Sequence, residues 1–399
     1  MAKFTSSVKT AVKGAFSALL HAFAGSQRHT RVSIVAPNAS PEELQEITSR
    51  AAYFFPQARA DIRVTPRFDL STLLSPAPVL LFGITLDELP GWARLHSGIF
   101  NVDHLRNPMD GWSWCEAGTY VNGIQDQAIA KTRLIQRIRA IQAMGFQRCY
   151  VFGTGPSLER ARHRDWQDGA RVVCNTIVRD AELWHHIDPH LVTAGDAIYH
   201  FGFTAFARAF RTDLHTRMKE SPEVLFVYPD YFDFIVRREF ADMADRLIPI
   251  PNGTQARVHD DLDSNYTLPP LGNVLNKLLL PLGCNLNKHV GLWGFDGRAP
   301  TDQLFWSNSQ KQSYAELMPT LQAAHPAFFD HFVPRENPEK YVQSVHGDVL
   351  EYLLSQAERD GWSFTMLHHT WTPTLAKRMD AQAQAESQAL MARARQASS

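Results

Sequence analysis

Residues 148–158 read Arg-Cys-Tyr-Val-Phe-Gly-Thr-Gly-Pro-Ser-Leu (RCYVFGTGPSL). A short run of strand-forming residues leads into two glycines one residue apart, which predicts a strand that turns sharply into a helix. Glycine lets a ligand approach the backbone closely, and the free amides and dipole at a helix start favour an anion such as phosphate. The stretch therefore predicts a phosphate-binding turn made by Gly153, Thr154, Gly155, Pro156 and Ser157.

Two common nucleotide-binding motifs do not describe this turn. The Gly-Lys-Ser/Thr of a P-loop is missing. Leu158 stands where a dinucleotide fingerprint has its third glycine, and no acidic residue closes the next apolar run, residues 171–175. A tight strand–helix turn without a ligand is the alternative that these residues leave open.

The composition sets the size and broad class of the protein. The chain has 399 residues, 44% hydrophobic and 20% charged, which suits two globular domains with extensions. Its formal net charge of −1 gives no basic field, so we expect no nucleic-acid partner. The four cysteines are scattered and apolar-flanked, which is typical of reduced core residues in a cytoplasmic protein.

Strands alternate with helices along most of the chain, so the predicted class is α/β: a Rossmann-like doubly wound sheet with a smaller N-terminal α/β unit and a C-terminal helical extension. The predicted division is a basic amphipathic helix at 1–29, the N-terminal unit at 30–123, a larger Rossmann-like domain at 124–371 and a C-terminal helix or tail at 372–399.

The first 25 residues carry Lys3, Lys9 and Lys13 among small and apolar side chains. This pattern predicts a helix that lies on an anionic bilayer, which would place a cytoplasmic protein at the inner face of the cell membrane. A helix packed on its own domain and a cleaved signal peptide are the alternatives.

Several further motifs follow the glycine turn in order. Cys174-Asn175 and Asp196 stand at the ends of the next two predicted strands, Gly272 opens a helix that closes with Leu282-Gly283, and Gly294-Phe295-Asp296 ends another strand. Gln310, Lys311, Met318-Pro319 and Asp330-His331-Phe332 come next. Together they resemble the bacterial sialyltransferases of glycosyltransferase family 42. More distantly they resemble proteins built like 6-hydroxymethylpterin diphosphokinase, a group that includes motility accessory factors. The resemblance covers residues 147–370.

This resemblance implies a glycosyltransferase that moves an acidic sugar, a nonulosonate or a Kdo-like sugar, from a CMP-linked donor to a glycan or lipid-linked acceptor. It implies that His331 or His346 is the general base and that neither a metal nor a cofactor is needed. The implied nucleotide-binding residues are Gly153, Thr154, Gly155, Pro156, Ser157, Asn175, Asp196, Gly272, Gly294 and Asp296.

Departures from the family pattern keep two other functions open. The family's serine before the helix is Leu271 here, and its two tyrosines have no clean match near Leu304, Trp306 and Tyr314. A diphosphokinase would use ATP and Mg²⁺, and a non-catalytic scaffold would keep the turn as a relic. Asp261-Leu262-Asp263 has the Asp-x-Asp pattern of metal-dependent transferases, but such carboxylates are more often solvated. The adjacent histidines 185–186 and 368–369 have the wrong spacing for shared metal ligation.

Overall fold

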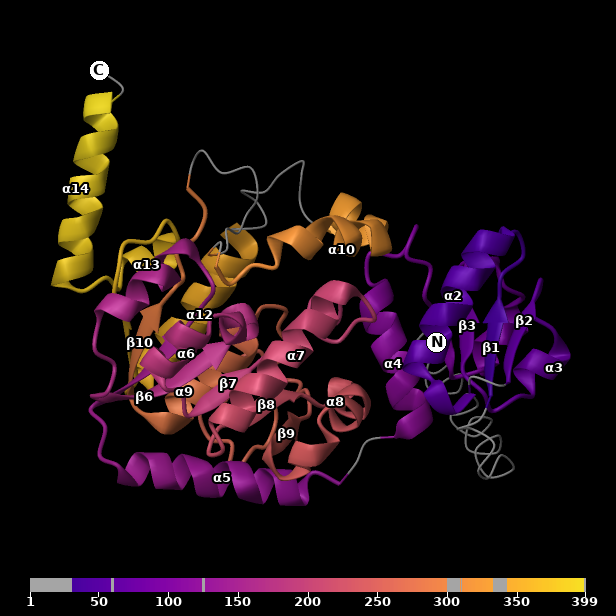
Figure 1. The fold of residues 1–399 in the computed structure, drawn as a ribbon, viewed down its shortest axis with the longest axis horizontal. Coiled ribbons are helices and arrows are strands. Elements are labelled where there is room, and N and C mark those ends of the chain that lie inside the picture. The colour runs from indigo at the N-terminus through magenta and orange to yellow at the C-terminus, as the bar shows by residue number, and fades with distance from the viewer. Residues whose placement is uncertain are drawn as a thin grey trace, which may run out of the picture. The chain divides into compact units, whose positions relative to one another are not determined.

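The computed structural model describes residues 31–58, 61–123, 126–299, 309, 311–332 and 343–397. These residues form two compact units (Figure 1). The first contains 31–123 with the short segments Gly202–Thr204 and Thr320–Phe332, and the second contains the remaining described residues from Asp126 on. The amphipathic helix expected at the N-terminus lies outside the described residues. Within them, no helix combines the length and apolar character needed to cross a membrane.

The first unit is built on a four-stranded parallel sheet of order β2-β1-β3-β4. Its strands are β1 (Val32–Val35), β2 (Ile62–Thr65), β3 (Val79–Leu81) and β4 (Ile99–Asn101), and its helices are α2 (Pro41–Phe54), α3 (Leu70–Leu73) and α4 (Asp110–Asn122). Short 3₁₀ turns occur at Pro56–Ala58, Leu86–Glu88 and Gly91–Leu95. Helix α2 begins at Pro41, because the N-cap Ser40 and the N3 residue Glu43 form a reciprocal capping box.

A buried charged cluster holds the two short segments in the first unit. The Asp110 carboxylate, which is fully buried, lies 2.8 Å from Nδ1 of His325 and 3.6 Å from Nη1 of Arg50. Arg50 also donates to the Ala324 carbonyl (2.9 Å) and lies 4.4 Å from the ring centroid of Phe203. These contacts explain why segments that our sequence division assigned to 124–371 pack with the first unit, since a buried charge needs its partners nearby.

The second unit contains a seven-stranded, wholly parallel sheet of order β11-β10-β5-β6-β7-β8-β9. The strands are β5 (Arg148–Phe152), β6 (Gly169–Cys174), β7 (Leu191–Thr193), β8 (Leu225–Pro229), β9 (Leu247–Ile250), β10 (His289–Trp293) and β11 (Ser363–Met366). The α-helices are α5 (Ala128–Ala143), α6 (Ala181–Ile187), α7 (Ala205–Glu220), α8 (Asp233–Glu239), α9 (Leu280–Leu286), α10 (Met318–Ala324, shared with the first unit), α12 (Val349–Arg359), α13 (Pro373–Ala376) and α14 (Ala381–Ala397).

Shorter helical turns connect these elements. The 3₁₀ turns are Pro156–His163, Asn175–Arg179, Asp230–Phe232, Ala241–Arg246 and Ala315–Leu317, and the π turns are Leu275–Leu279, Phe328–Phe332 (in the first unit) and Gln343–Asp348. The π turn Leu275–Leu279 ends two residues before Pro281, whose ring would clash with the carbonyl four residues earlier if one regular α-helix ran through both segments. Gly283 then lets α9 approach β5, because a Cβ there would lie 3.0 Å from Val151 Cγ1.

Helices cover both faces of this sheet. On one face, buried residues of α5, α9 and α12 share a core with alternate residues of the strands, such as Val151 and Val172. On the other face, Trp166 packs edge-on against Tyr150 and Phe152, and α7 contributes Phe210 to an aromatic group around Phe201. The structure therefore confirms the predicted α/β class, a Rossmann-like sheet with a smaller N-terminal α/β unit and a C-terminal helix (Figure 1).

The strand order places a topological switch point between β5 and β10. From β5 the chain moves outward through β6, β7, β8 and β9, then returns to lay β10 on the other side of β5. The chain therefore continues from β5 to β6 on one side of this point and from β10 to β11 on the other side. Open α/β sheets bind their ligands at the carboxyl ends of the strands at such a point, so this edge is where the site should lie.

The buried cluster of the first unit can be tested by removing its acid. Asp110→Ala should lower the free energy of unfolding by about 3–5 kcal/mol, because it leaves the buried His325 without its carboxylate and takes away one of the two carboxylates beside buried Arg50, the other being Glu46. Urea unfolding followed by circular dichroism measures this loss. Asp87→Ala is the control, since the Asp87–Arg94 ion pair is exposed and should contribute nothing measurable. Equal behaviour of the two variants would contradict a structural role for the cluster.

Candidate functional site

The ends of β5 and β10 approach each other through their backbones. Gly153 N–H donates to Trp293 O (2.8 Å), and Gly155 N–H donates to Gly294 O (2.9 Å). Gly294 has a φ of +80°, and a Cβ built on it would lie 2.2 Å from Gly153 O. A side chain at Gly294 would therefore both strain the backbone and separate the strand ends. The structure brings together three of the predicted site residues at the switch point.

Asp296 occupies the position at the helix start that we expected an anion to take. Its carboxylate accepts a hydrogen bond from Ser157 N–H (3.1 Å) and another from Ser157 Oγ (2.8 Å). A Cβ on Gly155 would lie 2.2 Å from Asp296 Oδ2, so the glycine makes room for this carboxylate. Burial raises the pKa of Asp296 although the hydrogen bonds from Ser157 oppose the shift.

The turn amides therefore already have partners inside the protein. Gly155 N–H donates to Gly294 O, and Ser157 N–H donates to Asp296. Pro156 has no N–H, and Leu158 N–H donates to Gly155 O (2.9 Å). A phosphate at this turn would have to replace Asp296. Nucleotide binding by the turn residues, including Thr154 and Pro156, stays a prediction. The turn does not offer a row of unbonded amides to a phosphate, because the amides of Gly155, Ser157 and Leu158 already donate within the protein.

His368 completes the cluster, although the sequence analysis considered it only as a metal ligand. The side chain is fully buried at the end of β11. Its Nε2 accepts from Gly294 N–H (2.9 Å) and lies 2.9 Å from Ser157 Oγ, while Nδ1 lies 2.6 Å from His369 O. An acceptor at Nε2 and a carbonyl at Nδ1 define the neutral Nδ1–H tautomer. Burial lowers the pKa of His368 to about 4.

The order of these groups excludes one familiar chemistry. In a serine-nucleophile triad the imidazole stands between the hydroxyl and the carboxylate. Here the Ser157 hydroxyl stands between the Asp296 carboxyl group and the His368 imidazole. The cluster therefore holds the two strand ends together rather than activating Ser157.

Asn175 is the predicted residue whose hydrogen-bonding capacity is left open. It follows β6 directly in a left-handed conformation (φ +52°), and within the described part of the chain its buried Oδ1 has no hydrogen-bond partner. Asp196, which follows β7, is used locally, because its Oδ1 accepts from Ile198 N–H and Tyr199 N–H (both 2.8 Å). A buried acceptor without a partner costs about 1–3 kcal/mol, so the end of β6 is suited to a ligand that donates a hydrogen bond.

The two candidate bases belong to different units. His346 lies in the second unit, with Nδ1 3.5 Å from Asn273 Nδ2 beside Gly272, and burial lowers its pKa to about 4. His331 is exposed and lies in the first unit. Which of them serves as a base stays a prediction.

Tyr314, the tyrosine nearest to the family's leaving-group tyrosines in sequence, already has partners within the protein. Its hydroxyl donates to Asp213, its ring lies 4.6 Å from the Arg179 guanidinium, and burial raises its pKa. Gln310, Leu304 and Trp306 lie outside the described residues.

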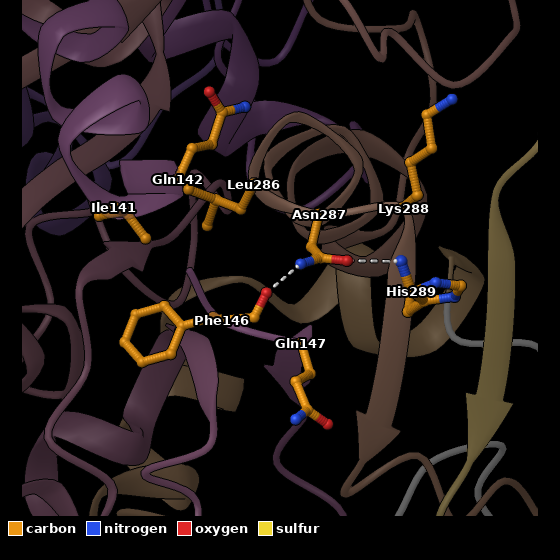
Figure 2. A pocket seen from close by; sticks show the side chains of 8 residues that line it. All are labelled: Ile141, Gln142, Phe146, Gln147, Leu286, Asn287, Lys288 and His289. Atoms are coloured by element: carbon orange, nitrogen blue, oxygen red, sulfur yellow. Dashed lines mark hydrogen bonds between the residues drawn. The ribbon is translucent and has the colours of Figure 1, made fainter. Parts of the chain in front are cut away.

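Two cavities lie at the amino ends of the strands, away from the switch-point edge. One of about 430 Å³ is lined by α5, the end of α9 and residues 286–289 (Figure 2). There Asn287 Nδ2 donates to Phe146 O (2.8 Å), and its Oδ1 accepts from His289 N–H (2.9 Å). The second, of about 290 Å³, includes Asp261 and Asp263. The first cavity lies at the amino ends of β5 and β10, and the second lies at the amino ends of β10 and β11, so neither coincides with the switch-point edge.

The Asp-x-Asp stretch has local roles in this structure. Asp263 forms an ion pair with Arg139 (2.5 Å), and Asp261 Oδ1 accepts from Ser264 N–H (3.0 Å). In the part of the chain that the structure describes, no three histidine, cysteine or carboxylate side chains are grouped to hold a metal ion.

The fold and the polar strand ends define the class, a Rossmann-like α/β protein with a candidate site at a topological switch point. No protein-family model matches the chain, and no curated protein matches it. Among solved structures, it is similar to the sialyltransferase CstII from Campylobacter jejuni, determined in complex with a substrate analogue, cytidine-5'-monophosphate. The identity is 11%, the match covers 58% of this chain and 87% of that one, and the TM-score is 0.29. At this TM-score the likeness carries no functional argument.

The buried imidazole of His368 should make stability depend on pH. Its folded pKa of about 4 lies below the ordinary 6.5, so its contribution is fully present above pH 6.5 and is lost as the pH falls toward 4, by about 3 kcal/mol in total. In His368→Gln, an amide oxygen replaces Nε2 and cannot be protonated there. Its deficit against the wild type should therefore shrink as the pH falls.

Urea unfolding at pH 7.5, 6.0, 5.0 and 4.5 measures this difference. The exposed His289→Gln serves as the control for loss of one histidine. Parallel curves for His368→Gln and the wild type across this range would show that the imidazole is not held neutral by the cluster.

Proposed function

We propose that the second unit is a glycosyltransferase that transfers an acidic sugar from a CMP-linked donor to a glycan or lipid-linked acceptor. The observation that carries the proposal is the partnerless Oδ1 of Asn175 at the carboxyl end of β6, one strand from the switch point. Nucleotides bind at this edge of open α/β sheets, and cytosine and ribose both carry hydrogen-bond donors for such an acceptor.

The chemistry needs only groups that the chain has. The acceptor hydroxyl attacks the anomeric carbon, its proton passes to a histidine, and CMP leaves with the electrons of the broken glycosidic bond. His346 is the candidate in the same unit as Asn175, and His331 is the other. A base with a pKa of about 4 is neutral at physiological pH and so is free to accept a proton, although its driving force is small. The protein would act in the cytoplasm, at the membrane face if residues 1–25 bind there.

One observation favours a second candidate, a scaffold that binds no nucleotide. The turn amides from Gly155 to Leu158 are satisfied internally, and Asp296 already caps the helix start. A protein whose turn is only a structural joint would have this arrangement. The pterin diphosphokinase alternative has no such observation in its favour.

A binding experiment separates these functions. Thermal unfolding of the full chain should shift upward with CMP, in EDTA as well as in Mg²⁺, because ligand binding adds RT ln(1 + [L]/Kd) to stability. Asn175→Ala should weaken CMP binding about tenfold, the cost of one hydrogen bond of about 1.4 kcal/mol. Asn287→Ala, at the amino end of the sheet, is the matched control and should bind CMP as the wild type does.

Other outcomes assign the protein elsewhere. A shift with ATP that needs Mg²⁺, without one for CMP, would support the diphosphokinase. The absence of a shift with CMP, CDP, UDP, GDP and ATP would support the scaffold and overturn the transferase.

A further inference from the structure

Lys277 is a nearly buried lysine that has no ion pair with a carboxylate in the part of the chain that the structure describes. The residue is 9% exposed on the π turn Leu275–Leu279. Among the described residues it forms no ion pair or side-chain hydrogen bond, and its Nζ lies 5.4 Å from the ring centroid of Tyr231. Buried charges in proteins are normally paired, because desolvation is costly. Burial lowers the pKa of Lys277 to about 8, which expresses the same cost.

The position of Lys277 is fixed by its neighbour on the turn. A Cβ on Gly195, just beyond β7, would lie 3.0 Å from Leu278 Cδ1 and 3.5 Å from Pro229 Cγ at the end of β8. The turn Leu275–Leu279 also packs on β6. Lys277 therefore stands at the carboxyl edge of β6, β7 and β8, the edge that also holds Asn175.

The carboxyl group that acts on Lys277 is that of Asp230, which is hydrogen-bonded to Gln127. Asp230 follows β8 directly and is near enough to oppose the fall in the pKa of Lys277. Its Oδ2, however, accepts a hydrogen bond from Gln127 Nε2 (3.0 Å), and burial raises its own pKa. Asp230 thus tempers the lysine charge without forming an ion pair with it.

Asn276 precedes Lys277 on the turn and is 1% exposed. Among the described residues, its Oδ1 has no hydrogen-bond partner. Adjacent side chains of a helical turn point in different directions, so Asn276 is a separate buried acceptor. A ligand that satisfies Lys277 carries a negative charge.

We propose that Lys277 anchors an oxyanion subsite at the carboxyl edge of β7 and β8. The anion is a phosphate of the nucleotide or the carboxylate of the acidic sugar. Naming these two sources rests on the function proposed above, whereas the subsite itself rests on the burial of Lys277 and on its lack of an ion pair among the described residues. The subsite is separate from the glycine turn, whose helix start already holds Asp296.

The test compares two lysines that both lie over an aromatic ring. Lys277→Met keeps the length of the side chain and removes the charge. Lys288→Met is the control, because exposed Lys288 lies 5.3 Å from the ring centroid of Trp362 at the amino end of the sheet. Binding to the full chain is measured by calorimetry with inorganic phosphate, CMP, cytidine and N-acetylneuraminate.

We expect Lys277→Met to weaken binding of the charged probes at least tenfold, with cytidine and the Lys288→Met control unaffected. Loss with phosphate and CMP identifies the nucleotide as the source of the anion, and loss with N-acetylneuraminate identifies the sugar. Without ligand, Lys277→Met should be as stable as the wild type or more so, since it relieves a desolvated charge. Lys277→Arg should retain binding of the anion.

Three results would overturn the subsite. These are equal binding of the charged probes by Lys277→Met and the wild type, no binding of any anion by the wild type, and unfolding of Lys277→Met, which would show a structural role for the ammonium. The proposed function fails separately. CMP binding that needs Asn175 but not Lys277 would keep the transferase and remove the subsite, and phosphate binding that needs Lys277 without CMP binding would do the reverse.

Discussion

The second unit depends on the close approach of two strand ends, those of β5 and β10. The chain leaves β5 to build four further strands and must then return to lay β10 beside it. The return succeeds because Gly153 and Gly294 bring the backbones into contact that no side chain would permit. Asp296 then crosses to Ser157 and joins residues 139 positions apart. The glycine pattern is thus first a requirement of the fold, and any ligand role has to be compatible with it.

Part of this arrangement is visible in the sequence. The run from Arg148 to Leu158 predicted a strand and a turn. The apolar runs that follow predicted the doubly wound sheet of an α/β fold, because parallel strands buried on both faces are continuously apolar. The polar residues that end β6 and β10, Asn175 and Asp296, were also predicted to lie at the functional edge. Periodicity and turn chemistry are local, so one chain suffices to read them.

The partners of those residues were not predictable in the same way. That Asp296 fills the helix start follows from the order of strands in the sheet, which no local pattern specifies. His368 was visible only as half of a histidine pair, and Lys277 lies in "NVLNKLLLPLG", where its burial depends on where the helix crosses the sheet. Likewise, Thr320–Phe332 joins the first unit through His325 and Asp110, a contact that spans 215 positions.

Electrostatics connects the closed turn to the open edge. A phosphate at the turn would compete with Asp296 for the same donors, losing charge-assisted bonds of about 1.5–3 kcal/mol. If Asp296 stayed ionised about 4 Å away, the repulsion would add about 4 kcal/mol at an effective dielectric constant of 20. In the proposed subsite at the other end of this edge, an anion would meet Lys277, whose desolvation has already been incurred during folding. An anion that binds Lys277 does not add the cost of desolvating the lysine, because folding has already incurred it. An anion that binds the turn adds the cost of displacing Asp296. The same edge can therefore use its turn as a joint and its lysine as the anion contact, with Asn175 between them for the rest of the ligand.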